Sequence, residues 1–212
     1  MFSVIFDMDG TLLDTQKICI PAWEYGGELQ GISGLGNHIE NVCGMNRQGW
    51  NAYLINLYPE LDTEKFNEDV RKYISDNMVV RFKPGAQELM DFLDENNIKY
   101  AIASGTSRQG VEHHINEVNS IDRFEVIVCG SDVKNGKPAP DVFLLTAQKM
   151  GVAPETCYVF EDSENGIRAA HGAGMKVFGI EDVATFNEEA KKLMFKQLNS
   201  LDEAISIFKE LL

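Results

Sequence analysis

Short apolar runs alternate with amphipathic stretches along most of the chain. The apolar runs have the length and pattern of strands buried on both faces, and they are Ser3–Phe6, Lys99–Ala103, Glu125–Val128, Cys157–Phe160 and Lys176–Ile180. The amphipathic stretches predict helices, and these are Gly85–Asn96, Ser107–Val118, Asp141–Met150 and Ser163–Ala173. Alternation of this kind predicts an α/β fold with a parallel, Rossmann-like sheet, and right-handed crossovers place helices on both of its faces.

One long stretch after the first strand breaks this alternation. It shows no strand pattern and instead predicts helices over Thr15–Leu29, Asn46–Leu57 and Thr63–Asn77. A glycine-rich region lies at 26–36, and its Gly31, Gly34 and Gly36 are expected to form a loop. A helical insertion at this point would lie above the carboxyl end of the first strand, where open α/β sheets bind ligands. We therefore expect a core domain of residues 1–14 and 79–212 and a small all-helical cap domain of residues 15–78.

Composition and charge narrow the possible partners. The 212 residues carry a net charge of -14, which opposes approach to nucleic acids and to anionic membranes. The four cysteines form no CxxC pair and are expected to be free thiols in a reducing compartment. The apolar run Phe2–Phe6 is too short for a signal peptide, and no apolar stretch is long enough to span a bilayer. We expect a cytoplasmic protein, and a monomer.

Polar residues follow four of the predicted strands. They are Asp7-Met8-Asp9-Gly10-Thr11 after the first strand, Ser104-Gly105-Thr106 after the second, Lys137 in a loop after the third, and Glu161-Asp162 after the fourth. Because the carboxyl ends of parallel strands meet at one edge of a sheet, these groups are expected to lie together.

Such a cluster would favour a cation and then an anionic substrate. Ionised Asp7, Glu161 and Asp162 together with Lys137 have a net charge of -2, which one Mg²⁺ would neutralise. Carboxylate oxygens without His or Cys suit Mg²⁺ better than zinc. The hydroxyl of Ser104, the ammonium of Lys137 and glycine backbone N–H groups could then bind a phosphate.

Each group also has a purely structural interpretation, and for Asp7 and Asp9 it is a turn or a chance pair of aspartates. Ser104 could cap the following helix, and Glu161 and Asp162 could be acidic residues favoured near a helix N-terminus. Lys137 could be an exposed loop lysine. These interpretations are plausible one at a time, but they do not account for all four groups at four strand ends.

In this order, the groups resemble the haloacid dehalogenase superfamily, in particular its members with a helical cap inserted after the first motif. Asp7–Thr11 is similar to its DxDGT motif, Ser104 to its second motif, Lys137 in Gly-Lys-Pro to its third, and Glu161-Asp162 to its fourth. The resemblance covers nearly the whole chain.

The resemblance implies a role for each of these residues. Asp7 would be the nucleophile that forms an aspartyl-phosphate, and Asp9 would transfer protons to and from the reacting oxygens. Mg²⁺ would be held by the Asp7 side chain, the Asp9 backbone carbonyl and the Asp162 side chain, with Glu161 as a direct or more distant ligand. Ser104 and Lys137 would complete the catalytic set, and Thr11 would orient Asp9. The predicted substrate contacts are Thr11, Gly105, Thr106 and Arg47.

Within the superfamily, the chain resembles both small sugar-phosphate phosphatases and β-phosphoglucomutase-like proteins. The segment Gly44-Met45-Asn46-Arg47 is similar to the mutase group, in which an arginine at the Arg47 position binds the distal phosphate. Two features favour a phosphatase: Cys19 stands where those mutases have a histidine, and Thr11 where they commonly have an aliphatic residue. We therefore expect a phosphatase acting on a small phosphorylated metabolite, with a phosphosugar mutase as the alternative.

Other classes fit less well. Residues 130–137 have the wrong spacing for a nucleotide-binding P-loop, and Pro138 replaces its Ser or Thr. A dehalogenase should lack the paired acids, and a non-catalytic interaction protein should have lost Asp7 or Lys137. Lys72 is interpreted as surface charge. The histidines are interpreted as surface or packing residues, and they are His38, His113, His114 and His171.

Overall fold

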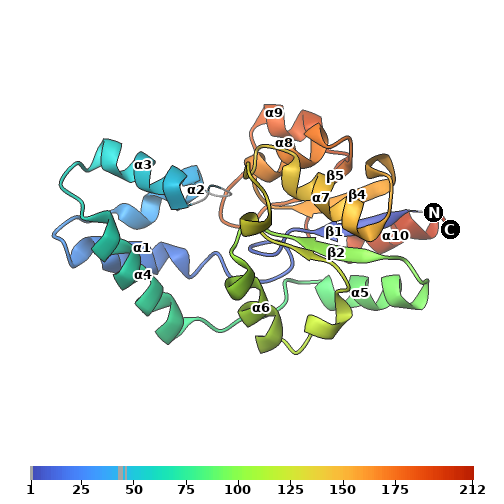
Figure 1. Ribbon diagram of the computed structural model, residues 1–212, viewed down its shortest axis with the longest axis horizontal. Coiled ribbons are helices and arrows are strands. Elements are labelled where there is room, and N and C mark those ends of the chain that lie inside the picture. The colour runs from blue at the N-terminus through green and yellow to red at the C-terminus, as the bar shows by residue number, and fades with distance from the viewer. Residues whose placement is uncertain (1, 43–44, 46) are drawn as a thin grey trace.

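The computed structural model describes residues 2–42, 45 and 47–212. A parallel sheet with helices on both faces forms one part of the molecule, and a group of helices lies beside it (Figure 1). Within the described residues, the sheet has six strands in the order β3-β2-β1-β4-β5-β6. The predicted fold class is confirmed.

All five predicted strands are present. They are β1 (Ser3–Phe6), β2 (Tyr100–Ala103), β3 (Ile127–Val128), β4 (Cys157–Glu161) and β5 (Lys176–Ile180). The first strand lies at the centre, because Phe6 is paired with Ile102 on one side and with Phe160 on the other. A further strand, β6 (Lys196–Leu198), was not predicted; only Leu198 of its residues is buried, so it leaves almost no apolar pattern.

Helices cover both faces of the sheet. Their bounds are α5 (Ala86–Glu95), α6 (Arg108–Glu117), α7 (Asp141–Met150), α8 (Glu164–Gly172), α9 (Glu188–Leu193) and α10 (Glu203–Lys209), with short 3₁₀ turns η2 (Ile121–Arg123), η3 (Gly130–Asp132) and η4 (Pro154–Thr156). Val4 and Phe6 point into a cluster with α5, α6 and α10, whereas Ile5 points into a cluster with α7, α8 and α9. This alternation along β1 divides the core into two layers.

The helical part has an apolar cluster of its own. Its elements are α1 (Cys19–Glu28), η1 (Leu35–His38), α2 (Ile39–Val42), α3 (Arg47–Leu57) and α4 (Thr63–Asn77). Trp23, Leu54 and Phe66 are buried together inside it. The bounds predicted for α4 are those observed. The helix begins after Asp62, whose side chain caps its N-terminus by accepting hydrogen bonds from two backbone N–H groups.

Part of the glycine-rich region is helical, as the predicted helix over Thr15–Leu29 requires for Gly26 and Gly27, whereas Gly36, which the sequence predicts in a loop, lies in η1. Gly26 and Gly27 lie within α1, and η1 and α2 occupy 35–42. A Cβ at Gly26 would lie 3.0 Å from atoms of both Phe66 and Val70, so glycine allows α1 to approach α4 closely. The described cysteines are free, with Cys19 half-buried and two others buried. Cys43, Gly44 and Asn46, which entered the sequence predictions, lie outside the described residues.

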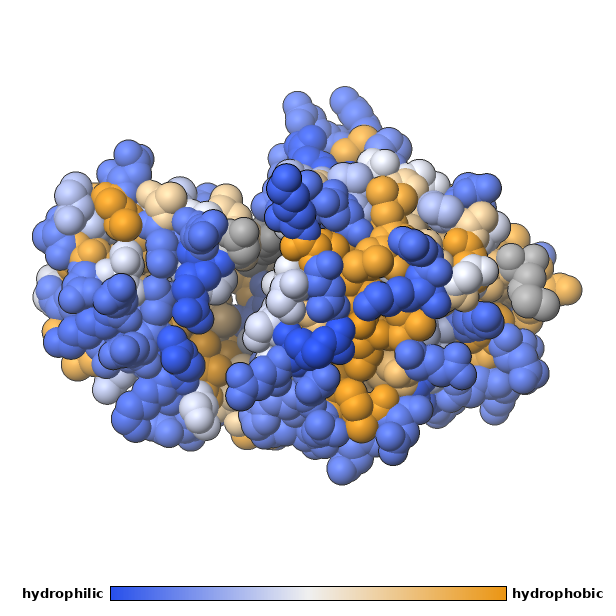
Figure 2. Space-filling model, in the orientation of Figure 1, coloured by the Kyte–Doolittle hydropathy of each residue, from blue (hydrophilic) through white to orange (hydrophobic). Residues whose placement is uncertain are grey.

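Two linkers connect the helical part to the sheet, and they run side by side. Asp14 N donates to Arg81 O at 2.9 Å, and Lys83 N donates to Leu12 O at 2.9 Å. We propose these linkers as the domain boundary, with the core at 1–14 and 79–212 and the cap at 15–78. The surface is hollowed between the two parts (Figure 2). None of the described helices has the length and apolar character needed to cross a membrane.

Asp182, in the loop after β5, ties both linkers to the sheet. Its Oδ1 lies 2.5 Å from Lys83 Nζ in the second linker and 3.3 Å from Lys17 Nζ in the first. The Asp182 side chain is fully buried and that of Lys83 is 7% exposed, so their pairing is shielded from water. The neighbouring Val183 packs against the apolar cluster of the cap.

We predict that Asp182→Asn lowers the free energy of unfolding by about 3 kcal/mol, because it leaves the buried Lys83 ammonium without its counter-charge. Asp76→Asn is a matched control, since Asp76 also pairs with a lysine, Lys72 at 2.7 Å, but both side chains are more than half exposed. The control should change stability by less than about 0.5 kcal/mol. Urea denaturation of the two variants measures the difference, and equal effects would contradict the prediction.

Candidate active site

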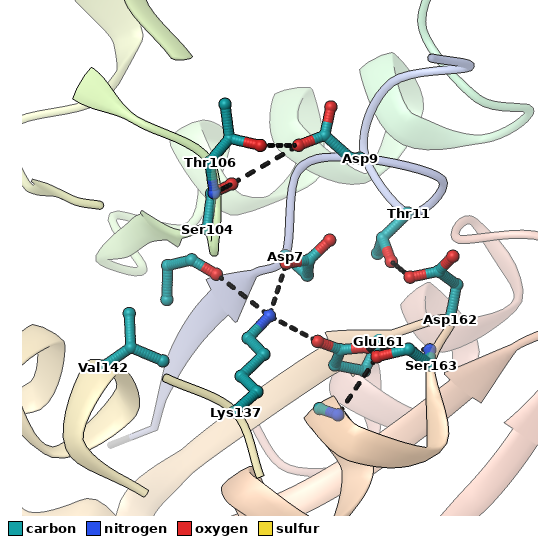
Figure 3. A network of polar contacts seen from close by, with 12 residues as sticks. Asp7, Asp9, Thr11, Ser104, Thr106, Lys137, Val142, Glu161, Asp162 and Ser163 are labelled. Atoms are coloured by element: carbon teal, nitrogen blue, oxygen red, sulfur yellow. Dashed lines mark hydrogen bonds and ion pairs between the residues drawn. The ribbon is translucent and has the colours of Figure 1, made fainter. Parts of the chain in front are cut away.

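A buried lysine joins two carboxylates at the centre of the sheet edge. Asp7 directly follows β1, and its backbone N–H donates to Phe160 O of β4 at 3.0 Å, which places it beside the end of that strand. Lys137 Nζ lies 2.5 Å from Asp7 Oδ1 and 2.5 Å from Glu161 Oε1 (Figure 3). Ala103 O at the end of β2 lies 3.5 Å from the same nitrogen. Groups from three strand ends and the Lys137 loop therefore meet at one point.

Glu161 is fully engaged in holding this arrangement. Its Oε2 accepts hydrogen bonds from Ser163 N at 2.8 Å and Ser163 Oγ at 3.0 Å, while Oε1 binds Lys137. A Cβ at Gly166 would lie 1.7 Å from Oε1, so only glycine leaves room for the carboxylate. Glu161 therefore holds Lys137 in place, and its role as a direct or more distant ligand of Mg²⁺ stays a prediction.

Asp9 is oriented by hydroxyl groups from two elements. Thr15 Oγ1 donates to Asp9 Oδ1 at 2.6 Å, and Thr106 Oγ1 donates to Asp9 Oδ2 at 2.7 Å. Ser104 Oγ makes a longer contact of 3.4 Å to Oδ2. Ser104 and Thr106, which follow β2, both point toward Asp9 (Figure 3). The following Gly10 has φ +82°, a conformation that glycine adopts without strain and that turns the chain back on itself.

Asp162 is the partner of Thr11 and Gln16. The family resemblance implied that Thr11 orients Asp9. In the structure, Thr11 Oγ1 instead donates to Asp162 Oδ1, at 3.3 Å. Thr15 and Thr106 orient Asp9 instead. Gln16 Nε2 donates to Asp162 Oδ2 at 2.8 Å and to the backbone carbonyl oxygen of Asp9 at 2.6 Å.

The electrostatics of the site show an excess of buried negative charge. Burial raises the pKa of Asp7 to about 8, and Glu161 and Asp9 add to the rise against the lowering effect of Lys137. Burial also raises the pKa of Asp162 well above its ordinary value, with Glu161 and Asp7 contributing. Burial disfavours the charged form of Lys137, but the two carboxylates beside it outweigh this and raise its pKa.

Asp9 behaves differently from its neighbours. Burial alone would raise its pKa, but interactions with His114, Thr15 and Thr106 outweigh burial and lower the pKa below its ordinary value. Asp9 is therefore held as a carboxylate that accepts hydrogen bonds, whereas Asp7 and Asp162 lack sufficient compensation for their charge.

The interpretation of His114 as a residue apart from the site is wrong. Its Nδ1 lies 3.8 Å from Asp9 Oδ1, and this buried nitrogen has no hydrogen-bond partner in the described part of the chain. His114 lies on the face of α6 that also carries the buried Val111, two turns after the N-cap Ser107. Helical periodicity from Ser107 could have indicated this position. By contrast, His38 is a packing residue of the cap, between the hydroxyls of Tyr53 and Tyr58.

Of the four residues predicted to contact the substrate, Arg47 and Gly105 take no part in the hydrogen bonds and ion pairs of the site described above. Arg47 is exposed at the start of α3, and no hydrogen bond or ion pair among the described residues links it to the site. A Cβ at Gly105 would meet no protein atom within 4 Å, so the space beside it is open, and its predicted contact with the substrate stays a prediction. Lys72 pairs with Asp76 on the surface, in keeping with its interpretation as surface charge.

The residues present fit a hard divalent cation. The oxygens of Asp7, Asp162 and the Asp9 carbonyl are the donors that Mg²⁺ prefers. A Cβ at Gly10 would lie 2.3 Å from Asp162 Oδ2, so glycine allows the backbone to lie close to this carboxylate. No cluster of three or more His, Cys, Asp or Glu side chains that could hold a metal ion occurs among the described residues.

Comparison with known families agrees with this geometry. The family described as haloacid dehalogenase-like hydrolase matches residues 4–180. The chain belongs to this family. The match runs from β1 to the end of β5 and so includes all of the site described above.

Several known proteins are similar to the chain over most or all of its length. A phosphorylated carbohydrates phosphatase of Thermotoga maritima is 29% identical over 218 residues, which cover 100% of both proteins. A β-phosphoglucomutase of Bacillus subtilis is 30% identical over 85% of this chain and 83% of its own length. The crystal structure of a hydrolase of the same superfamily from Deinococcus radiodurans, with bound phosphate and sodium, has a TM-score of 0.81 and 25% identity, over 99% of this chain and 96% of that one.

We predict that Gly166→Ala destabilises this hydrolase by roughly 1–3 kcal/mol, because the added methyl would overlap the Glu161 carboxylate and push it from Lys137. Gly172→Ala is the matched control on the same helix, since its Cβ would meet only Pro140, at 3.9 Å. The control should be neutral or slightly stabilising, because alanine favours helix over glycine. Chemical denaturation measures both variants, and equal stability would contradict the assigned role of Gly166.

Proposed function

We propose that the protein is a Mg²⁺-dependent phosphatase that hydrolyses a small phosphate monoester through an aspartyl-phosphate on Asp7. The observation that carries the proposal is the buried Asp7 carboxylate, whose Oδ1 is held by Lys137. Asp9, two residues after Asp7, is oriented separately by Thr15 and Thr106. This arrangement supplies a nucleophile and a separate proton-transfer group in one site.

In the first step, one Asp7 oxygen attacks the phosphorus atom of the ester. A bond forms between that oxygen and phosphorus while the bond from phosphorus to the ester oxygen breaks. Asp9, having taken up a proton, gives it to the departing oxygen, which leaves as an alcohol. The ammonium of Lys137 keeps Asp7 oriented and stabilises negative charge on the phosphoryl oxygens.

In the second step, Asp9 accepts a proton from a water molecule as the water oxygen attacks phosphorus. The bond between phosphorus and Asp7 breaks, and inorganic phosphate and the Asp7 carboxylate are produced. The interactions that lower the pKa of Asp9 favour its carboxylate form, which is the form that this step starts from.

Mg²⁺ would be held by the side chains of Asp7 and Asp162 and by the backbone carbonyl of Asp9. When bound, it supplies positive charge that offsets the buried carboxylates and polarises the phosphoryl group. Its presence would reconcile an anionic substrate with a chain whose net charge is -14.

Water is favoured as the acceptor of the phosphoryl group by the residue near Asp9 on the first cap helix, α1. Cys19, on the first cap helix, is close enough that Asp9 contributes to a pKa raised to about 12, chiefly through burial of the thiol. The neutral thiol cannot replace the hydrogen bonds and charge of a histidine.

The full-length similarity to a phosphatase of phosphorylated carbohydrates supports a sugar phosphate or similar metabolite as substrate. The 30% identity to a β-phosphoglucomutase keeps a phosphosugar mutase as the second candidate.

A panel of sugar phosphates, assayed for release of inorganic phosphate with Mg²⁺ and with EDTA, tests the proposal. We expect activity with Mg²⁺ only, and a loss on the order of a thousandfold or more in Asp7→Asn, because the amide cannot act as the nucleophile. Asp76→Asn, on the exposed surface of the cap, should keep full activity. Retained turnover in Asp7→Asn would remove Asp7 from its proposed role.

The same panel separates the alternatives. A mutase would convert β-glucose 1-phosphate, primed with a bisphosphate, into glucose 6-phosphate faster than it releases phosphate. A non-catalytic protein would bind Mg²⁺ but turn over none of the esters.

A further inference from the structure

The Gln16 side chain occupies a position that concerns the cation directly. Its Nε2 donates to Asp9 O at 2.6 Å and to Asp162 Oδ2 at 2.8 Å. These oxygens belong to two of the three groups assigned above to Mg²⁺. One amide nitrogen therefore satisfies a backbone carbonyl and a buried carboxylate that the cation would also use.

The chemistry of the amide makes these two uses competitive. An NH₂ group offers two donors and no acceptor, so its nitrogen cannot bind Mg²⁺. Mg²⁺ needs its oxygen ligands at about 2.1 Å in nearly octahedral positions. Gly10 confirms how little space is available, because a Cβ there would lie 2.3 Å from Asp162 Oδ2 and 2.8 Å from Gln16 Nε2.

We propose that the Gln16 amide is an internal competitor of the active-site cation, holding Asp9 O and Asp162 until Mg²⁺ displaces it. This inference rests on the proposed Mg²⁺ site and adds a residue that sets its affinity. Gln16 is a positioning residue in this sense, since it acts through the two oxygens to which it donates.

The place of Gln16 in the chain gives the exchange a further consequence. It lies in the linker between the Asp7–Thr11 loop and α1, between Thr15, which is bonded to Asp9, and Lys17, which is paired with Asp182. Displacement of its side chain thus takes place at the entry to the cap. Metal binding and the conformation of this linker are coupled through one side chain.

The test is the affinity of the metal-free, full-length protein for Mg²⁺ alone, measured by isothermal titration calorimetry without any phosphate ester. We expect Gln16→Ala to bind Mg²⁺ roughly tenfold more tightly than the wild type, because the cation no longer has to break two hydrogen bonds. Gln16→Ser, which is also too short to reach both oxygens, should show the same gain and serves if the alanine variant does not fold.

Gln30→Ala is the matched control. Gln30 also makes two hydrogen bonds, to Asp62 O at 3.0 Å and from Asp62 N at 2.9 Å, but it lies in the cap away from the carboxylates. Its loss should leave the Mg²⁺ affinity unchanged. A merely structural role for Gln16 would weaken or preserve metal binding and would not tighten it.

The outcomes distinguish this inference from the proposed function. Equal or weaker Mg²⁺ binding in both Gln16 variants, with binding by the wild type, would overturn the competition and leave the phosphatase proposal intact. Absence of Mg²⁺ binding in the wild type would instead overturn the metal site itself, and the competition with it.

Discussion

The buried Lys137 ammonium, placed between the Asp7 and Glu161 carboxylates, is the interaction on which the rest of the site depends. Each of these carboxylates would be costly to bury alone, and a shared lysine at 2.5 Å from both offsets part of that cost. The packing around Glu161 serves the same contact, since Ser163 binds its second oxygen and Gly166 leaves room for it. The lysine compensates the site only in part, and the raised pKa of Asp7 and of Asp162 shows the charge that is left over.

That remaining charge links the structure to its proposed chemistry. A site whose buried positive and negative charges cancelled would have no need of a cation and would repel a phosphate less than this site does. Here the carboxylates stay short of positive charge, so a divalent ion and then an anionic substrate can be accommodated. The uncharged Gln16 amide donates hydrogen bonds to Asp162 and to the Asp9 carbonyl, and these cost less to remove than a second buried ammonium would.

The sheet and the linkers provide the geometry that this chemistry requires. The first strand lies between β2 and β4, so Asp7 is reached by groups from both sides. The cap is attached by two adjacent linkers, and Asp182 contacts a lysine in each of them. The same short segment that leads into the cap also contributes Thr15 and Gln16 to the site. The reacting groups and the attachment of the cap are therefore parts of one structure.

The sequence by itself determined the α/β class, the first five strands, the helix over Thr63–Asn77 and the gathering of Asp7, Asp9, Lys137 and Glu161 at one edge. Those features follow from local periodicity and from the rule that parallel strands end together. It did not identify β6, whose pattern is too short, or the 3₁₀ turn η1, which includes Gly36. Only the tertiary structure decided that Thr11 bonds to Asp162, that His114 faces Asp9 and that Gln16 joins two distant oxygens. These contacts depend on the direction of single side chains between segments far apart in the chain, and periodicity carries no information about that direction.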